Sequence, residues 1–329
     1  MTEAPVELVW NKGIARLCDR RIPDEFPDGL VYRPVARLAG APISPDLPAD
    51  VIADLSGYAD IREGEIVWVR LSWLSAFVRR VLPLIEARFV LATGDSDSSV
   101  PSGLPADLAN AILASPKVIR WFAQNHDGAA PDRMAPLPIG IDFHSVAEHP
   151  IWGEDVAAPG AQAALLMAIR NDLPSLERRI AAAYVDFAWG RPLRHRPAPA
   201  AAHLPESRHA IVTMLRRRDA VVCQAAPLPR REMWRRRGRY AVVLSPHGGG
   251  LDCHRTWEAL ALGHLVVVPS SGLDPLFEGL PVVPVQSWTE VTEENLARWL
   301  SAARPDPGAR ERLTSGYWVE RMRSVTAGS

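Results

Sequence analysis

Short apolar runs alternate with amphipathic helical patterns along most of the chain, and no other feature constrains the fold as strongly. A strand that is apolar along its whole length needs cover on both faces, and an intervening helix supplies that cover. Because a helical pattern separates most neighbouring strands, the pattern predicts parallel sheets. The expected fold class is therefore α/β, with doubly wound, Rossmann-like sheets.

The alternation occurs twice, and a segment near residues 150–160 separates the two series. A chain of 329 residues is long enough for two domains, each with its own core. We therefore expect an N-terminal domain over 1–155 and a C-terminal domain over 156–329. In sheets of this kind, ligands bind beyond the carboxyl ends of the strands.

Individual elements follow from the periodicity of apolar residues. The expected strands of the two halves are 65–70, 88–94, 118–125 and 134–142, then 182–189, 220–224, 240–245, 264–270 and 280–286. The expected helices are 73–86, 104–115, 161–181 (bent at Pro174), 207–217, 230–239, 254–262, 292–303 and 307–322. Gly263 suits the position just after a helix, because glycine adopts positive φ without strain.

Charge and cysteine content exclude several classes of protein. The net charge is −1, so the chain as a whole has no bias toward nucleic acid. Three cysteines without a CxxC pair argue against a disulfide framework and a thiolate zinc site. The N-terminus has no secretory pattern, and the longest apolar run contains Arg70. We expect a cytoplasmic protein.

The stretch SPHGGGLDCHRTWEALALGH, residues 245–264, places three glycines between an expected strand and an expected helix. A helix N-terminus favours anions, and glycines let a phosphate approach the backbone. Arg255 can donate two hydrogen bonds to a phosphate, whereas Glu258 can accept hydrogen bonds from the two hydroxyls of a ribose. These residues together predict a site for a nucleoside diphosphate.

Other interpretations of this stretch stay open. A triple-glycine loop is often only a turn, and Glu258 can be a solvated residue paired with His254 or Arg255. No lysine follows the glycines as in a P-loop, and the stretch is a poor match to GxGxxG. An enzyme that uses a nucleotide for phosphoryl transfer or as a redox cofactor is therefore disfavoured.

Residues 245–288, SPHGGGLDCHRTWEALALGHLVVVPSSGLDPLFEGLPVVPVQSW, resemble the donor-binding half of exostosin-type glycosyltransferases. Shorter pieces of the first half also agree with that family, at 89–97, 121–127 and 136–144. The resemblance implies a GT-B fold, in which two Rossmann-like domains face each other across a cleft. It also implies that Glu258 holds the donor ribose. His247 departs from the family pattern, where an arginine is common.

The resemblance further implies transfer of a sugar from a nucleotide sugar, expected to be a UDP-sugar, to a glycan or a lipid-linked acceptor. The expected reaction inverts the anomeric centre in a single displacement and uses no metal or other cofactor. The loop after the first strand of the second half opens on the same cleft in this architecture, which adds Arg194. The expected donor-binding residues are Ser245, His247, Gly248, Gly249, Gly250, Asp252, His254, Arg255, Glu258 and Arg194.

Candidate bases follow two strands of the first half. Asp95 and Asp97 lie in TGDSD after strand 88–94, and His126 follows strand 118–125. A carboxylate or imidazole there can take the proton of an acceptor hydroxyl. Two alternatives stay open: the aspartates cap a turn, or they bind a metal ion in a metal-dependent transferase. His126, like any lone histidine, is more often a loop residue than a catalyst.

Basic clusters occur at 214–219 and 230–239. A run of charge on a helix is usually a solvated face, and we expect that here. The alternative is peripheral attraction to an inner-membrane surface that carries a lipid-linked acceptor. No nucleic-acid-binding motif accompanies the charge. A third class of function also stays open, a GT-B-like module that binds a nucleotide sugar without catalysis.

Overall fold

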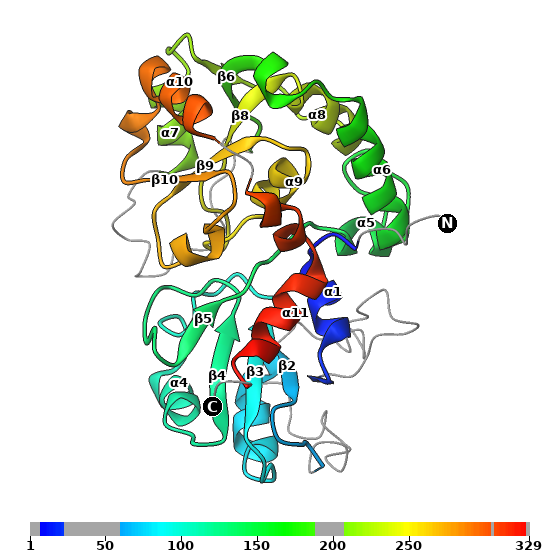
Figure 1. The fold of residues 1–329 in the computed structure, drawn as a ribbon, viewed down its shortest axis with the longest axis vertical. Helices are drawn as coiled ribbons and strands as arrows, with labels where there is room; N and C mark the ends of the chain where they lie inside the picture. Colours follow the sequence, from blue (N-terminus) through cyan, green and yellow to red (C-terminus); the bar gives the residue numbers. More distant parts are fainter. Residues whose placement is uncertain (1–6, 23–59, 188–206, 304–305, 327–329) are drawn as a thin grey trace.

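The computed structural model describes residues 7–22, 60–187, 207–303 and 306–326. Its strands form two five-stranded sheets, and every strand pair in them is parallel. Figure 1 shows the two halves stacked along the long axis of the molecule, with helices packed around each sheet. The α/β class and the two Rossmann-like sheets expected from the sequence are confirmed.

The first sheet runs straight across in chain order. Its strands are β1 (Arg20–Ile22), β2 (Ile66–Arg70), β3 (Phe89–Gly94), β4 (Val118–Ala123) and β5 (Met134–Pro136). Alternate side chains of β2 point to opposite faces, so Trp68 packs in one core and Val67 in another. One face is covered by η4 (Leu71–Trp73), α3 (Leu74–Ala76), η5 (Phe77–Val81) and α4 (Ala106–Leu113).

The second sheet has the order β10-β9-β8-β6-β7. Its strands are β6 (Ile180–Val185), β7 (Val221–Cys223), β8 (Tyr240–Leu244), β9 (Leu265–Pro269) and β10 (Val282–Val285). The chain moves outward in one direction from β6 to β7 and in the other from β8 to β10. The switch point therefore lies between β6 and β8, where ligands bind in open α/β sheets.

Helices cover both faces of the second sheet. Those on the face that shares its core with the first half are α6 (Pro159–Asp172), α8 (Arg230–Arg237) and α9 (His254–Ala261). Those on the other face are α7 (Arg208–Leu215) and α10 (Glu293–Ala302). Smaller elements are α5 (His144–Glu148), η6 (Leu176–Arg178), η8 (Asp274–Phe277), η9 (Trp288–Glu290), η10 (Pro307–Ala309) and η11 (Glu311–Leu313).

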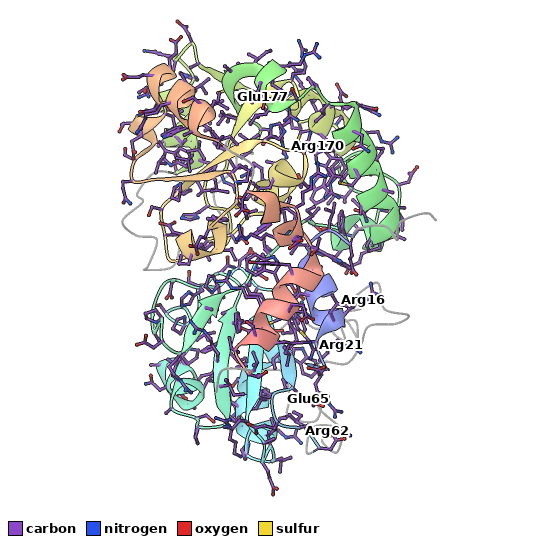
Figure 2. The ribbon with its side chains drawn as sticks, in the orientation of Figure 1. Arg16, Arg21, Arg62, Glu65, Arg170 and Glu177 are labelled. Carbon is purple, nitrogen blue, oxygen red and sulfur yellow. The ribbon has the colours of Figure 1, made fainter. Side chains whose placement is uncertain are left out.

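The two sheets present their carboxyl ends to each other. The Asn125 side chain, just beyond β4, accepts a hydrogen bond from the backbone N–H of Asp252, in the loop that follows β8 (2.8 Å). The His254 imidazole at the start of α9 contacts the carbonyl oxygen of Gly140 in the first half (2.7 Å). Side chains and loops of both halves thus meet between the sheets (Figure 2).

The last helix crosses from the second half to the first. Helix α11 (Ser315–Ser324) packs against α1 (Asn11–Leu17), and together they cover the second face of the first sheet (Figure 1). Beside this pair, the backbone N–H of Val9 donates a hydrogen bond to the carbonyl oxygen of Leu313 (2.7 Å). Trp318 of α11 also meets Trp257 of α9 edge to face, with ring centroids 6.2 Å apart. One apolar core therefore runs through both halves.

Several expected elements differ in detail. The helix expected over 73–86 is a succession of 3₁₀, α and π turns that ends at Val81. The helix expected over 161–181 ends at Asp172, because Pro174 disfavours the helical conformation of the residue before it. Gly263 follows α9 with φ +77°, as predicted. Within the described residues, no helix is long and apolar enough to cross a membrane.

Candidate functional site

The three glycines of the loop after β8 lie where the two halves meet, and two of them face the first half. A Cβ on Gly249 would collide with the Asp97 carboxylate, and one on Gly250 would meet the amide nitrogen of Asn125 at 2.5 Å. A Cβ on Gly248 would stand 2.9 Å from a guanidinium nitrogen of Arg208. Close approach of first-half side chains therefore accounts for Gly249 and Gly250, whereas the flexible end of Arg208 could move away from a side chain at Gly248. Phosphate binding by the loop stays a prediction.

Asp252 links the two halves. Its carboxylate accepts hydrogen bonds from the backbone N–H of Ile139 (2.8 Å) and from the indole N–H of Trp257 (2.9 Å). Burial raises the pKa of Asp252 to about 6, although the N–H groups that it accepts from oppose the shift. The side chain is thus engaged between β8, α9 and the first half, and its predicted contact with a donor is untested.

The two histidines of the predicted donor site bond to loop carbonyls. His247 Nδ1 contacts the carbonyl oxygen of Leu251 (2.6 Å), which closes the glycine loop. His254 Nδ1 contacts Gly140, and its ring centroid lies 5.8 Å from that of His144. Burial lowers the pKa of His254, while the charge of Asp142 opposes the shift. A neutral His254 is therefore favoured.

Glu258 is buried in a charge network. Its two carboxylate oxygens pair with Arg230 (2.9 Å) and Arg237 (3.4 Å) of α8. Burial raises the pKa of Glu258, but the two guanidinium charges more than compensate, so the net pKa is lowered and the carboxylate is ionised. Glu258 is thus the counter-ion of two buried arginines. Its predicted role as the ribose ligand stays a prediction.

The network continues to the switch point of the second sheet. Asp186, directly beyond β6, pairs with Arg237 (2.6 Å) and with Arg255 (3.3 Å). Arg255 also donates a hydrogen bond to the hydroxyl of Ser245, at the end of β8 (3.4 Å). Two residues of the predicted donor site, Ser245 and Arg255, therefore meet where the strand order reverses.

Arg208, at the start of α7, was not predicted and lies in the same place. Its Nε donates to the carbonyl oxygen of His247 (2.9 Å). The guanidiniums of Arg208 and Arg255 both lie over the Phe187 ring, 5.8 and 5.3 Å from its centroid. Burial and the charge of Arg255 lower the pKa of Arg208. Two cations are thus held close together, and a bound anion would relieve their repulsion.

A sequence signal for Arg208 exists. Ser207 caps α7 by accepting the N–H of Ala210 (3.2 Å), so Arg208 is the first residue of the helix. A cation at the N-terminus of a helix is unfavourable because it opposes the helix dipole, unless an anion binds there as well.

We call Arg208, Arg230, Arg237, Arg255, Asp186 and Glu258 the arginine cluster. It contains four guanidiniums and two carboxylates.

The expectation that 230–239 is a solvated face is wrong for two arginines. Arg230 is 4% exposed and Arg237 is 1% exposed. Both share a helix face with the buried Trp234, because positions four and seven residues along a helix are neighbours. That spacing of a tryptophan between two arginines is the signal that could have separated them from Arg231, Arg235 and Arg236, which are exposed.

A second group of charges lies at the carboxyl end of the first sheet. Asp95 follows β3 with φ +62°, a backbone conformation that costs an aspartate about 1–3 kcal/mol. Its carboxylate pairs with Arg70 (3.0 Å), and its backbone N–H donates to Gln124 (3.0 Å). Such strain is typical of functional positions, where surrounding contacts hold a side chain in place.

Lys12 of α1 is buried in the same group. Its Nζ lies 3.6 Å from Glu148. Burial lowers the pKa of Lys12, and the charges of Asp95 and Glu148 oppose the shift. Nearby, Asp142 pairs with His144 (3.0 Å). We call Lys12, Arg70, Asp95, Asp142 and Glu148 the carboxylate cluster, since three of its five charges are negative.

The other base candidates are in different surroundings. Asp97 is exposed, and its carboxylate lies against Gly249 of the second half. His126 is buried, and its Nε2 contacts the carbonyl oxygen of Ala129 (2.8 Å). Burial and this contact give His126 a role in the loop after β4. Arg194 lies outside the described residues. Within the part of the chain that the structure describes, no group of three or more potential ligands gathers to hold a metal.

Comparisons with known proteins give a distant likeness only. No protein-family model and no curated protein matches the sequence. An α,α-trehalose-phosphate synthase (UDP-forming) from Burkholderia vietnamiensis is 13% identical, with a TM-score of 0.38, over 82% of this chain and 72% of the other.

Two further solved structures have lower TM-scores. One, described as trehalose-6-phosphate from E. coli bound with UDP-2-fluoro glucose, contains a chain that is 12% identical over 82% of this chain and 70% of its own, with a TM-score of 0.35. AviGT4, a glycosyltransferase involved in avilamycin A biosynthesis, is 15% identical over 78% and 90%, with a TM-score of 0.29. Nothing about the chemistry of this chain follows from these scores, and the exostosin resemblance is not confirmed.

Proposed function

We propose that the chain is a GT-B glycosyltransferase that takes a sugar from a nucleoside diphosphate sugar. The observation that carries this proposal is the pair formed by Arg208 and Arg255. Two guanidiniums are held over one aromatic ring, at the switch point of a parallel sheet. Four guanidiniums of the arginine cluster share only two carboxylates, so a bound dianion would complete the balance of charge.

The same pair explains how a diphosphate would leave. As the bond between the anomeric carbon and the diphosphate oxygen breaks, negative charge builds up on that oxygen. Arg208 and Arg255, together with the N-termini of α7 and α9, would stabilise this charge in surroundings of low dielectric constant. This role needs no divalent ion, and we propose that the reaction is metal-independent.

The carboxylate cluster supplies the other half of the reaction. The acceptor hydroxyl would attack the anomeric carbon, and its proton would pass to Asp95. Arg70 would hold the Asp95 carboxylate in place. One C–O bond forms, one breaks, and the configuration inverts. The uridine base, and a glycan or lipid-linked acceptor, rest on the resemblance of residues 245–288 to exostosin-type enzymes.

A thermal-shift comparison tests the proposal. UDP should raise the melting temperature more than uridine does, because uridine lacks the diphosphate that Arg208 and Arg255 would bind. A ligand at a hundred times its dissociation constant adds about 2.7 kcal/mol of stability. Slow release of free sugar from a UDP-sugar would then distinguish an enzyme from a binding module. If no nucleoside diphosphate shifts the melting temperature, the proposal fails.

A further inference from the structure

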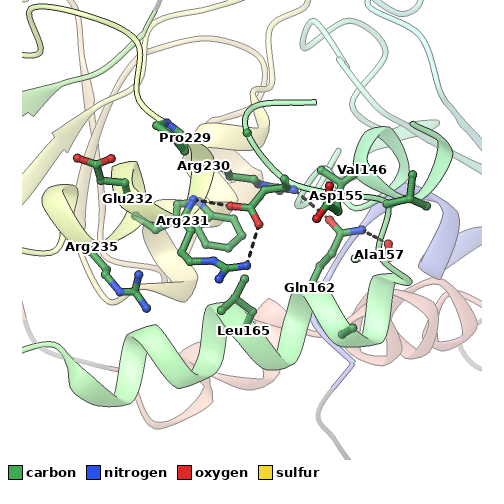
Figure 3. Close-up of a pocket in the computed structure, with 15 residues that line it drawn as sticks. Val146, Asp155, Ala157, Gln162, Leu165, Pro229, Arg230, Arg231, Glu232 and Arg235 are labelled. Carbon is green, nitrogen blue, oxygen red and sulfur yellow. Dashed lines mark hydrogen bonds and ion pairs between the residues drawn. The ribbon is translucent and has the colours of Figure 1, made fainter. Parts of the chain in front are cut away.

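A pocket of about 590 Å³ lies outside the region between the sheets. Figure 3 shows it between α6, α8 and the loop 153–157, which leads from α5 into α6. Its volume is within the range of small-molecule sites. The pocket belongs to neither the arginine cluster nor the carboxylate cluster, except for Arg230, which lines it.

The polar groups of the pocket are held in place. Glu154 accepts hydrogen bonds from the backbone N–H (3.1 Å) and the guanidinium (3.0 Å) of Arg231. The buried Gln162 amide donates to the carbonyl oxygens of Ala157 (2.8 Å) and Phe143 (2.8 Å). Its own oxygen accepts from Arg230 (3.0 Å). A lining fixed in this way does not have to be ordered by a ligand.

The charges of the lining balance. Three guanidiniums and three carboxylates line it, from Arg230, Arg231, Arg235, Glu154, Asp155 and Glu232, and Arg230 also pairs with Glu258 outside the pocket. A lining that mixes both signs of charge gives an anion or a cation little net attraction. An apolar ligand would have to desolvate these groups without pairing them. The lining suits a neutral ligand that is rich in both donors and acceptors.

An aromatic platform stands beside the pocket. Trp152 is 44% exposed although it is a large apolar residue, and it precedes Gly153, which lines the pocket. Both residues have positive φ, +55° and +72°. The Trp152 ring packs on the guanidinium of Arg230 at 5.3 Å, and its carbonyl oxygen accepts the Arg230 backbone N–H (2.8 Å). The turn at Trp152 and Gly153 and the two contacts with Arg230 therefore fix the position of the exposed Trp152 ring.

We infer that this pocket binds a neutral saccharide segment, with Trp152 under a sugar ring and Glu154 and Arg231 on adjacent hydroxyls. Vicinal hydroxyls offer donors and acceptors side by side, as carboxylates and guanidiniums do. The inference rests on the proposed function only in expecting a glycan acceptor, of which this segment would be a part distant from the reacting hydroxyl. Because Arg230 contacts both the pocket and Glu258 (2.9 Å), the pocket adjoins the arginine cluster.

Saturation-transfer NMR with cellotriose, maltotriose and triacetylchitotriose tests the inference on the full chain without any nucleotide. At least one trisaccharide should bind, and saturating UDP should not displace it. Trp152→Ala should weaken that binding about fivefold. Glu154→Gln should weaken it about tenfold, through loss of charged hydrogen bonds. Leu84→Ala, which removes an equally exposed apolar side chain (44%) from the first half, is the matched control and should bind normally.

Three results would overturn the inference. The first is that none of the three trisaccharides binds. The second is that Trp152→Ala and Glu154→Gln bind as tightly as the parent chain. The third is displacement of the saccharide by glutamate or inorganic phosphate, which would show an ionic site. None of these results affects the UDP-dependent thermal shift, so failure of the inference and failure of the proposed function are distinguishable.

Discussion

The two halves of the molecule bring opposite excesses of charge to the region between them. The arginine cluster has four guanidiniums for two carboxylates, around the switch point of the second sheet. The carboxylate cluster has three carboxylates for two cations, at the end of the first sheet. Apart from the exposed Glu148, the members of both clusters are buried or half-buried, so water screens their charges less than it would on the surface.

This contrast assigns different chemistry to the two sides. An excess of guanidinium is suited to an anion, and an excess of carboxylate is suited to accepting a proton. A substrate that carries a diphosphate on one side and receives a hydroxyl on the other would use both. The strand orders agree with this division, because the order of the described strands reverses at a switch point in the second sheet, whereas those of the first sheet follow one another in chain order.

The largest expected effect comes from Asp95→Asn, which removes the basic oxygen and keeps the shape. We expect kcat to fall by about 10²–10⁴, the usual contribution of a general base, with donor affinity nearly unchanged. Steady-state kinetics and UDP titration measure the two quantities. Asp107→Asn, an exposed aspartate in the same half, serves as the control.

Near-normal turnover by Asp95→Asn would remove Asp95 from the reaction and pass the role to Asp97 or His126. Loss of donor affinity instead would mean that the carboxylate cluster binds the donor, and the division between the two sides would be wrong.

Glu258→Ala tests whether the ion pairs of Glu258 stabilise the fold or whether Glu258 binds the donor. It leaves Arg230 and Arg237 buried without their shared carboxylate, which should lower the free energy of unfolding by about 3–5 kcal/mol. Denaturant unfolding measures this change, and Glu232→Ala on the exposed side of α8 is the control. A variant of normal stability that no longer binds UDP would instead make Glu258 a donor ligand, as the sequence predicted.

Arg208→Gln should weaken UDP binding by about tenfold to a hundredfold, since charged hydrogen bonds to the diphosphate are lost. Stability should not fall, because the substitution also removes the repulsion between Arg208 and Arg255. Calorimetry compares it with Arg216→Gln, an exposed arginine just beyond the same helix. Equal UDP affinity in the two variants would exclude Arg208 from the donor site.

The smallest expected effect is that of a chelator. If guanidiniums stabilise the leaving diphosphate, EDTA should leave the rate of sugar transfer unchanged. Loss of activity that Mn²⁺ restores would favour the alternative in which Asp95 and Asp97 hold a metal ion. It would also mean that the carboxylate cluster, and not the arginine cluster, stabilises the diphosphate.

Local signals in the sequence were sufficient for nine of the ten described strands, but β1 (Arg20–Ile22), which has only three residues and begins with two arginines, was missed. Strands such as 66–70 and 240–244 are continuous apolar runs, and Gly263 marks the end of α9. Helix α1 was missed because it has only seven residues, with a glycine in its first turn. Its stability comes from packing against α11, at the other end of the described chain, which no local pattern records.

The candidate site could be predicted only in part, for a similar reason. The sequence placed Ser245 and Arg255 beside the carboxyl end of a strand, where the structure has them. It could not show that Arg208 contacts His247, a residue 39 positions later, or that Arg230 and Arg237 turn inward to Glu258. Those pairings depend on how helices α7 and α8 pack on the sheet, because sequence periodicity defines a helix face and not its partner.

Because α11 packs on the first half, that half can finish folding only after α11 has been synthesised. During synthesis, the strands of the first sheet emerge with one face covered only in part, by α1, because the helix that packs there beside α1 is made about 300 residues after it. At ribosomal rates this delay is roughly 15–60 s. The nascent N-terminal half would therefore expose part of its apolar surface for that time, and it would acquire its final stability only together with the rest of the chain.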